Sequence, residues 1–367
     1  MADALIIGGG AIGLASAWTL AKHGLAVTVL ERDVGSVHAA SRAAAGMLSA
    51  QLESHPSEAM AALCLRGRER HATFLPELAE ASGADLEYRT VGALRVAFSD
   101  EDAANLIDLV EAPRARGWEA RIVSSAEARD LEPSLSACHS GAFFPGEAVV
   151  EPNRVVDALV RACIERGVTL RTGVLAAQVL HAGGRATGVL LHNGDRLAAG
   201  HVIVAGGAWS ASLEGTGIEG KLRPIRGQML ELRHARAPSR LVEGPGAYLS
   251  PRTDGRMLVG STLEDVGFER AVTVGAATQL LNAAVRLLPH LAEATLAAHW
   301  CGFRPATRDG LPLLGATSTG ALAATGHHRN GIVLSAITAD IVTALVTGKS
   351  SPVELTPFAP GRVLPLG

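Results

Sequence analysis

The chain has 367 residues, of which 48% are hydrophobic and 19% are charged, and its formal net charge is -3. This length exceeds the size at which a single hydrophobic core stops growing, so we expect two domains, and the composition excludes an intrinsically disordered chain. The small negative charge and a count of three lysines predict no basic surface for nucleic acid, so no nucleic-acid partner is expected.

The first thirty-one residues predict one dinucleotide-binding unit. A short apolar strand over 4–7 runs into a glycine-rich turn over 8–13, which opens a helix that ends near His23. A second apolar strand follows and ends at Glu31. Strand, tight glycine turn, helix and strand in this order are typical of a nucleotide-binding βαβ unit.

Each glycine of this turn has its own predicted task. Gly8 permits the tight turn, Gly10 lets the backbone approach a pyrophosphate, and Gly13 lets the helix pack closely on the sheet. Glu31 lies close to the expected distance of about 20 residues downstream, where a carboxylate binds ribose hydroxyls. The alternative is a glycine-rich turn that binds no ligand.

The middle of the chain predicts helices and strands in an irregular order. Small residues over 42–50 indicate a flexible segment. The next expected elements are a helix over 58–82, a strand over 91–98, a short helix opened by a capping box at Ser124 and Glu127, a helix capped by Asn153 that ends near Arg166, and a strand over 168–171.

Two hairpins are predicted next, with turns at Gly183-Gly184 and at Asn193-Gly194. An apolar strand over 201–205 then enters a second glycine-rich turn, 206–209, in front of a helix. A protein that binds only NAD would normally build a second mononucleotide half directly after the first, whereas this chain returns late to the sheet.

The last third of the chain shows no internal repeat and no low-complexity linker, so we expect its domains to interleave. The expected elements are strands over 225–232, 247–251 and 256–260, the last two joined at Asp254-Gly255, then a helix over 274–288, a strand over 321–324, a loop over 325–330 and a helix over about 331–346.

Several kinds of site and location are not expected. The cysteines Cys64, Cys138, Cys163 and Cys301 lack CxxC spacing, and the histidines are scattered, so neither a disulfide framework nor a metal site is predicted. A strand that starts at residue 4 leaves no room for a signal peptide, which favours the cytoplasm. The apolar run 332–346 is too short and too polar to span a membrane.

Seven segments carry a resemblance to a known family. They are AAAGML (43–48), VGALRVAFSDED (91–102), AGGAWS (205–210), RPIRGQML (223–230), YLSPRTDGRMLVGSTLEDVGF (248–268), GFRPATRDGLPLLG (302–315) and GHHRNGIVLSAITADI (326–341). In this order they resemble the glycine oxidase branch (ThiO) of the D-amino acid oxidase and sarcosine oxidase superfamily of flavoenzymes.

The resemblance implies a D-amino acid oxidase-like α/β fold of mixed, partly α+β, character. A Rossmann-like FAD-binding domain, made of residues 1–85, 147–219 and 301–367, would interleave with an antiparallel-sheet substrate domain, made of residues 86–146 and 220–300.

The resemblance also implies that FAD binds non-covalently. The loop 329–332 would face the flavin at the start of the last helix, whose N-terminus would stabilise negative charge; plain helix capping is the alternative there. The implied FAD-binding residues are Gly8, Gly10, Ala11, Ile12, Gly13, Glu31, Arg32, Ser41, Arg42, Ala45, Gly46, Met47, Leu48, Val174, Gly206, Gly207, Trp209, Gly302, Arg304, His328, Arg329, Asn330, Gly331 and Ile332.

Substrate recognition would fall mainly to two residues. Arg304 matches the arginine that pairs with the substrate carboxylate, and Tyr248 matches the tyrosine whose hydroxyl supports the same group. A guanidinium fork fits a carboxylate, and a phenol adds a donor on a rigid ring. Arg329 is the third residue expected at the catalytic centre, and Met47 is expected on the pocket wall.

Two departures from the family pattern bear on substrate size. Gly246 stands where the well-known glycine oxidases have a histidine, and Leu263 replaces a methionine near the substrate. Both are therefore expected on the pocket wall, with open space beside Tyr248. That space predicts that N-substituted glycines such as sarcosine are oxidised at least as efficiently as glycine. Alternatively, a neighbouring side chain fills the gap and glycine stays preferred.

A third departure concerns the flavin link. Cys301 lies near the position at which sarcosine oxidases carry a cysteine bonded to the flavin, but the register of the following residues differs by one. A buried thiol is therefore expected, with a covalent link as the alternative.

The implied reaction is oxidation of the C–N bond of glycine or of a small or N-substituted glycine. A hydride leaves the α-carbon of the neutral amine, the imine hydrolyses to glyoxylate or another ketoacid and an amine, and dioxygen is reduced to hydrogen peroxide. No side chain need act as a base. The resemblance also suggests a role in thiamin thiazole synthesis and a homo-oligomer, either a dimer or a tetramer.

Three other functions stay open at this point. A dehydrogenase of the same fold would pass its electrons to an acceptor other than oxygen. An oxidoreductase that removes a carboxymethyl group from a tRNA base would need a basic surface, which this composition does not predict. A silent nucleotide-binding scaffold would not need Arg304 and Tyr248.

Overall fold

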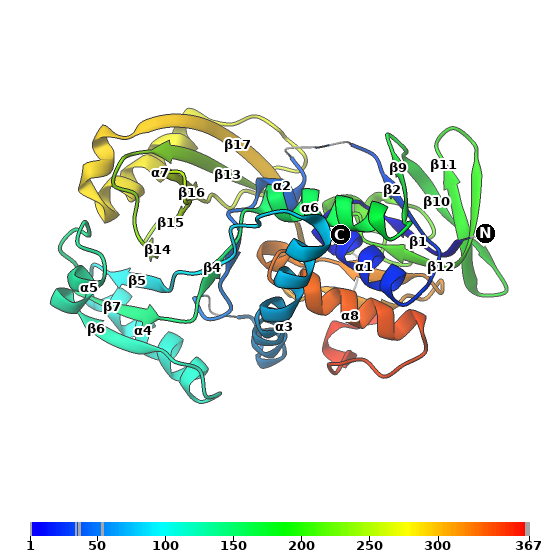
Figure 1. Ribbon diagram of the computed structural model, residues 1–367, viewed down its shortest axis with the longest axis horizontal. Coiled ribbons are helices and arrows are strands. Elements are labelled where there is room, and N and C mark those ends of the chain that lie inside the picture. The colour runs from blue at the N-terminus through cyan, green and yellow to red at the C-terminus, as the bar shows by residue number, and fades with distance from the viewer. Residues whose placement is uncertain (1, 34, 36–37, 53–54, 364–367) are drawn as a thin grey trace.

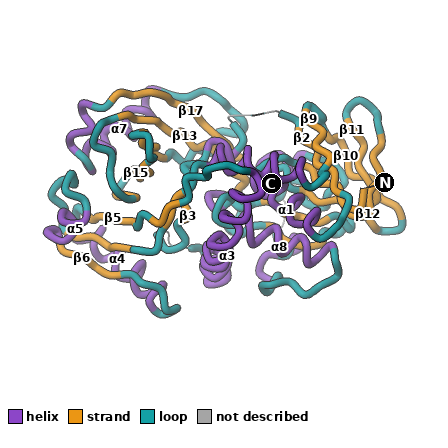
Figure 2. The backbone as a smooth tube through the Cα atoms, viewed as in Figure 1, coloured by secondary structure: helices purple, strands orange, loops and turns teal. Residues whose placement is uncertain are grey.

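The computed structural model describes residues 2–33, 35, 38–52 and 55–363, and these build two sheets at opposite ends of an elongated molecule (Figure 1). Figure 2 shows that most of the long helices lie between and beside these sheets. None of the helices in the described part of the chain combines the length and the apolar character that crossing a membrane requires.

The first sheet is centred on β1 (Ala2–Ile7), which pairs in parallel with β2 (Val27–Glu31) and β12 (Arg196–Val204). Parallel pairing continues outward through β9 (Thr169–Thr172) on one side and β19 (Leu322–Thr325) on the other. β18 (Leu313–Ala316) closes that edge as an antiparallel strand. The carboxyl ends of β1, β2 and β12 therefore meet at one edge, where nucleotides bind in such sheets.

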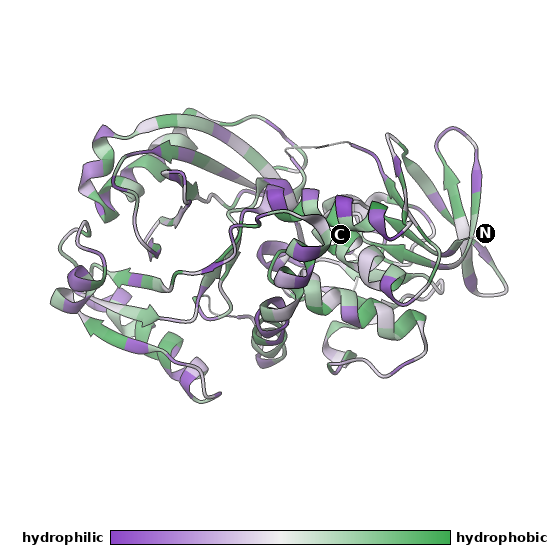
Figure 3. Cartoon of the chain, in the orientation of Figure 1, coloured by the Kyte–Doolittle hydropathy of each residue, from purple (hydrophilic) through white to green (hydrophobic). Residues whose placement is uncertain are grey.

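The two faces of β1 enter different cores. Ala4 and Ile6 face a core shared with the helices, whereas Leu5 and Ile7 face a core shared with the hairpin strands. Successive side chains of a strand point to opposite faces, which explains the division. Figure 3 shows hydrophobic residues along the strands of both sheets. The helices of the first core are α1 (Ala11–Lys22), α3 (Glu58–Ser82), α6 (Pro152–Glu165) and α8 (Ser335–Val346).

The strands β10 (Ala176–Ala182) and β11 (Arg185–Leu191) form a hairpin that turns at 183–184, and β11 and β12 form a second one that turns at 193–194, both as predicted. The strand predicted over 201–205 is the second half of β12. Residues of its first half pair antiparallel with β11, and those of its second half pair in parallel with β1. One strand thus joins the hairpin to the central sheet.

The second sheet is antiparallel except where β14 pairs with β5 in parallel. Its strands, in spatial order, are β17 (Thr295–Ala306), β13 (Arg223–Arg233), β16 (Arg256–Gly260), β15 (Ala247–Pro251), β14 (Leu241–Gly244), β5 (Ala93–Ala97), β7 (Ser140–Phe144) and β6 (Arg121–Ser124). The helix α7 (Val274–Leu287) packs on β13 to β16, and α4 (Asp100–Arg114) packs on β5 to β7.

Short elements connect the two halves. The strands β3 (Met47–Leu48), β8 (Ala148–Val149) and β4 (Arg89–Thr90) form a small sheet between them. The remaining helices are α2 (Ala40–Ala43), α5 (Ser125–Leu131) and the 3-10 turns Gly207–Ser212, Pro289–Glu293, His328–Asn330, Thr356–Phe358 and Pro360–Arg362. The expected segment boundary at residue 301 falls inside β17, which stays paired with β13 as far as Ala306.

Most predicted elements are confirmed, but two local predictions are wrong. The capping box at Ser124 and Glu127 is present, and α3 covers the predicted residues. Asn153 does not cap α6: Glu151 does, because Pro152 occupies the first helical turn and the Glu151 side chain accepts from the Asn153 N–H. The last helix begins at Ser335 after a 3-10 turn, not near 331. The segment predicted to be flexible contains the end of α2 and all of β3.

Candidate functional site

A large cavity connects the two sheets. Its empty volume is about 1850 Å³, which includes space open to solvent. It begins at the carboxyl ends of β1, β2 and β12 and reaches β13, β15 and β17 of the antiparallel sheet. The cavity therefore suits an extended ligand with a second, smaller molecule at its far end.

The first glycine-rich turn forms one end of the cavity. Gly8 has φ +114° and lies so close to the Ala205 carbonyl that a Cβ there would overlap it. Gly10 directly precedes α1 without a side-chain cap, and the Ala11 N–H donates to Ser41 Oγ at 3.0 Å. Gly13 is not among the described residues that line the cavity. A Cβ on Gly13 would overlap the Gly8 carbonyl, so its role is the predicted close packing of helix on strand.

The predicted ribose-binding carboxylate lies beside this turn. Glu31 lines the cavity, its Oε2 accepts from the Gly9 N–H at 2.6 Å, and its Oε1 accepts from the Asp33 N–H at 2.8 Å. These bonds fix the carboxylate at the end of β2. Arg32 also lines the cavity, pairs with Asp33 at 2.7 Å and lies over the Trp209 ring, 4.6 Å from its centre. Val174 lines the same region.

Part of the segment predicted along the flavin faces the cavity. Ser41 and residues 45–47 line it, whereas the described lining includes neither Arg42 nor Leu48. The Arg42 side chain extends to α6, where Nη2 donates to Asp157 Oδ1 at 2.7 Å. Leu48 is fully buried in the main core. The side chains of Arg42 and Leu48 thus lie away from the cavity, and alternation along β3 explains why Leu48 points away from Met47.

The second glycine-rich turn forms the opposite wall. Gly206, Gly207 and Trp209 line the cavity, and the turn opens a 3-10 helix. Trp209 stacks on Phe268 with ring centres 5.0 Å apart, and both rings contact Phe303 edge-on. This aromatic group closes the wall with apolar surface.

The loop before α8 contributes five residues to the cavity lining: His328, Arg329, Asn330, Gly331 and Ile332. Because α8 itself starts four residues after Gly331, the loop presents a 3-10 turn to the cavity instead of an α-helix N-terminus. Burial, followed by the charges of Arg304 and Arg329, lowers the pKa of His328 to about 4. This histidine is therefore neutral at pH 7.

Arg304 and Tyr248 both line the part of the cavity that the antiparallel sheet forms. The Arg304 guanidinium is half-buried; Nη1 donates to the Thr262 carbonyl at 3.0 Å, and Nη2 donates to Ser261 Oγ at 2.7 Å. It lies flat against Gly227, where a Cβ would overlap it. The Tyr248 hydroxyl donates to Met229 Sδ at 3.3 Å. A cationic fork and a phenol thus share one pocket.

Three residues of this pocket were not predicted from the sequence. Gly227, Met229 and Ser261 line the cavity and contact Arg304 or Tyr248. All three lie inside the segments 223–230 and 248–268 that carry the family resemblance, which is the signal that could have identified them.

Two predicted pocket residues lie elsewhere, and the described lining includes neither of them. Gly246 occupies the tight turn before β15 with φ +92°, and a Cβ there would lie 3.2 Å from Ala283 Cβ on α7. Leu263 is 64% exposed on the outer surface. Gly246 precedes β15, so strand alternation does not put it on the same face as Tyr248.

Cys301 is fully buried behind the cavity wall. It does not belong to the described lining, although its neighbours Gly302 and Phe303 do. Its thiol donates to the Arg270 carbonyl at 3.3 Å, and burial raises the thiol pKa above its usual value. A protonated, hydrogen-bonded thiol outside the cavity is a poor nucleophile.

The cavity fits a flavin dinucleotide on its own geometry. Gly8 packs on Ala205 and Gly302 packs on Ala43 so closely that a Cβ on either glycine would overlap its neighbour, so both residues line the cavity with backbone alone. Glu31 supplies ribose acceptors at one end, and Arg304 supplies an anion-binding fork at the other. Between them the lining consists mainly of glycine, alanine and apolar side chains, which suits a planar ring system.

Comparison with known proteins agrees with this geometry. A family model described as FAD dependent oxidoreductase matches residues 3–345. The chain is 34% identical to a glycine oxidase of Geobacillus kaustophilus over 97% of this chain and 96% of that relative. It is also 34% identical to a bifunctional ThiO/ThiG protein of Trichormus variabilis, of which it spans 54%.

The crystal structure of glycine oxidase from Geobacillus kaustophilus matches with a TM-score of 0.93 at 32% identity, covering 99% of both chains. Because the family model covers most of the chain, this protein belongs to the family of FAD-dependent oxidoreductases.

Proposed function

We propose that this enzyme oxidises the C–N bond of glycine, or of a small N-substituted glycine, to an imine that hydrolyses to glyoxylate and an amine, with dioxygen as the electron acceptor. The observation that carries the proposal is that Arg304 and Tyr248 both line a cavity that fits FAD, with the Arg304 guanidinium held in place by Thr262 and Ser261. The likeness to glycine oxidases over nearly the whole chain supports the same substrate.

FAD, when bound, supplies the two-electron acceptor for this oxidation. We assign its dinucleotide end to Gly8, Gly10 and Glu31, and its ring system to the segment 45–47 and the loop 329–332. These assignments are supported by the lining of the cavity and by the carboxylate of Glu31 at the end of β2.

The protein's own contribution is to hold the substrate. A guanidinium carries five N–H groups, so Arg304 can keep its bonds to Ser261 and Thr262 and still bind a carboxylate with its fork. Tyr248 is placed to orient the same group. With the carboxylate fixed, the α-carbon of the neutral amine is presented to the cofactor in one orientation, and proximity replaces a catalytic base. The neutral His328 adds no competing charge.

The location of Gly246 outside the described cavity lining bears on the size of the substrate. The described lining of the cavity includes neither Gly246 nor Leu263, which supports glycine over longer N-alkylglycines as the substrate. The match to about half of a bifunctional ThiO/ThiG protein supports a role in thiamin thiazole synthesis. A cytoplasmic location and a dimer or tetramer complete the proposal.

The oxidase activity is tested on the purified protein under air. We expect flavin absorption bands, and we expect hydrogen peroxide and glyoxylate to form in equal amounts from glycine. Peroxide-free turnover that needs an added quinone would identify a dehydrogenase instead. Kinetics on glycine, sarcosine and longer N-alkylglycines should show efficiency that falls as the substituent lengthens; a rise with length would contradict the assignment of pocket size.

We also predict that FAD is bound without a covalent link. Acid precipitation should leave the yellow cofactor in the supernatant, because the Cys301 thiol is buried outside the cavity and its pKa is raised. The Cys301→Ser variant should release the same amount of FAD as the natural protein. Colour that stays in the pellet of the natural protein, but not of the variant, would instead show a cysteine link.

A further inference from the structure

A buried arginine lies directly behind the segment that we assign to the flavin ring. Arg252 follows β15, which carries Tyr248, and its side chain is fully inaccessible to solvent. Its guanidinium Nε donates to Glu151 Oε2 at 2.9 Å, and Nη2 donates to the Ala45 carbonyl at 2.6 Å. The arginine thus links the substrate sheet to the N-terminus of α6 and to the cavity wall, although it does not itself belong to the described lining.

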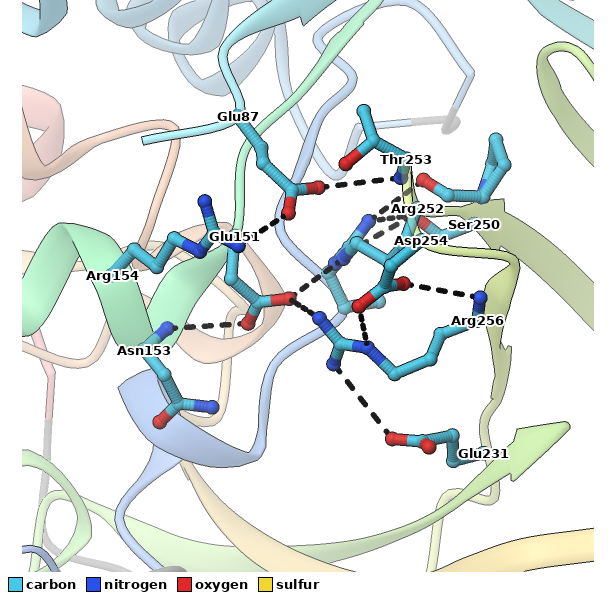
Figure 4. A network of polar contacts seen from close by, with 12 residues as sticks. Glu87, Glu151, Asn153, Arg154, Glu231, Ser250, Arg252, Thr253, Asp254 and Arg256 are labelled. Atoms are coloured by element: carbon cyan, nitrogen blue, oxygen red, sulfur yellow. Dashed lines mark hydrogen bonds and ion pairs between the residues drawn. The ribbon is translucent and has the colours of Figure 1, made fainter. Parts of the chain in front are cut away.

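The partners of Arg252 form a network that Figure 4 shows from close by. Glu151 lies between two arginines and also accepts from Arg256 Nη2, at 3.3 Å. Arg256 is held in turn by Asp254 at 2.7 Å. Nη1 of Arg252 donates to Ser250 Oγ and to the Pro251 carbonyl, both at 3.1 Å. Every nitrogen of the buried guanidinium therefore has a partner.

The Ala45 carbonyl is the point at which this network reaches the cavity. It accepts from Arg252 Nη2 and also from Ser250 Oγ, at 3.2 Å, which uses both of its lone pairs. The following residue is fixed as well, because the Gly46 carbonyl accepts from the Val150 N–H at 2.9 Å. Gly46 has φ +67°, and a Cβ there would overlap the Val150 carbonyl.

Holding one carbonyl fixes the direction of the next N–H. The peptide between Ala45 and Gly46 is trans, and the C=O and N–H of a trans peptide point in opposite directions. Because the carbonyl points toward Arg252, the Gly46 N–H points away from it. Ala45 and Gly46 both line the cavity, and Arg252 lies behind them, outside the described lining.

We propose that Arg252 is a positioning residue for the cofactor: together with Glu151 it fixes the Ala45–Gly46 peptide so that the Gly46 N–H is offered to the bound flavin. The inference rests on our placement of the flavin along residues 45–47. A buried ion pair adds little net stability compared with apolar packing, so its value here lies in the geometry that it imposes. The same network also connects the Tyr248 strand to that peptide, and thereby sets the two sides of the active centre relative to each other.

The test compares two arginines that share the Glu151 carboxylate. Arg252→Lys keeps the charge, but a lysine ammonium cannot span Glu151, Ser250 and Ala45 as the guanidinium does. We expect the apoprotein to bind FAD at least about tenfold more weakly, with shifted absorption bands and reduction potential of the bound flavin, since a hydrogen bond from a charged donor to the wall is lost. Arg256→Met removes an arginine that bonds Glu151 but has no bond to Ala45, so it should change the dissociation constant and the spectrum less than Arg252→Lys does.

Ser250→Ala provides a second variant in case the lysine variant does not fold. It removes the other donor to the Ala45 carbonyl and should cause a smaller loss of FAD affinity with unaltered thermal unfolding of the apoprotein. The proposal is overturned if both Arg252→Lys and Ser250→Ala bind FAD like the natural protein, or if Arg256→Met weakens FAD binding as much as Arg252→Lys. These measurements need no substrate, so failure to oxidise glycine would refute the proposed function and leave this test intact.

Discussion

Replacing Arg304 by alanine should lower kcat/KM for glycine by at least about a hundredfold while FAD stays bound. Removing one partner of a desolvated charge pair costs about 3 to 5 kcal/mol, and each 1.4 kcal/mol is a factor of about ten in rate. The guanidinium is oriented by Ser261 and Thr262, so a substrate carboxylate finds a fork that is already in place. Arg304→Lys should lose nearly as much, because a lysine cannot make two parallel bonds.

Steady-state peroxide formation measures this effect, and the flavin spectrum measures whether the cofactor is retained. Arg308→Ala is a matched control, because Arg308 is an exposed arginine four residues along the same chain segment. We expect this control to keep normal kinetics. An Arg304→Ala variant with near-normal kcat/KM would remove Arg304 from the substrate pocket, whatever the identity of the cofactor.

The second large effect concerns stability and pH. Glu147 is fully buried just before β8; its Oε1 accepts from the Gln51 N–H at 3.2 Å, and Arg68 Nη1 lies 3.9 Å away. Burial raises the pKa of this carboxyl from 4.5 to about 7, and the Arg68 charge offsets the burial only in part. The folded protein therefore holds a proton that the unfolded chain releases near pH 4.5.

The sign of the effect follows from this difference. Below pH 4.5 the carboxyl is protonated in both the folded and the unfolded state, so its titration does not change the free energy of unfolding. Between pH 4.5 and about 7 only the unfolded state ionises, so the free energy of unfolding falls by about 1.4 kcal/mol per pH unit on account of this group. Above pH 7 the loss is complete, at about 3 kcal/mol.

Glu147→Gln removes this titration. We expect the variant to gain about 3 kcal/mol relative to the natural protein between pH 4.5 and pH 8, measured by urea unfolding at each pH. The exposed Glu80→Gln on α3 is the control and should change little over the same range. If the free energies of unfolding of Glu147→Gln and the natural protein differ by the same amount at pH 4.5 and at pH 8, Glu147 does not titrate with a raised pKa.

The sequence by itself determined those features whose signals are local. The strand over 4–7, the glycine turn and the carboxylate at Glu31 follow from short-range pattern, and so do the hairpin turns and the strands β15 and β16, whose bounds match the prediction. The capping box at Ser124 is likewise a contact between residues three positions apart. Such elements depend on backbone dihedral preferences and on alternation, which neighbouring residues dictate.

Only the tertiary structure decided where side chains meet across long separations. Gly246 is two residues from Tyr248, yet a turn takes it out of the pocket, while Gly227, far away in sequence, packs on Arg304. The bond from Arg252 to the Ala45 carbonyl joins residues 207 positions apart. Strand ends, the two pairings of β12 and the partners of buried charges depend on how the sheets fold against each other. These partners matter because a charged side chain that is buried without hydrogen-bond or ion-pair partners strongly destabilises the folded state.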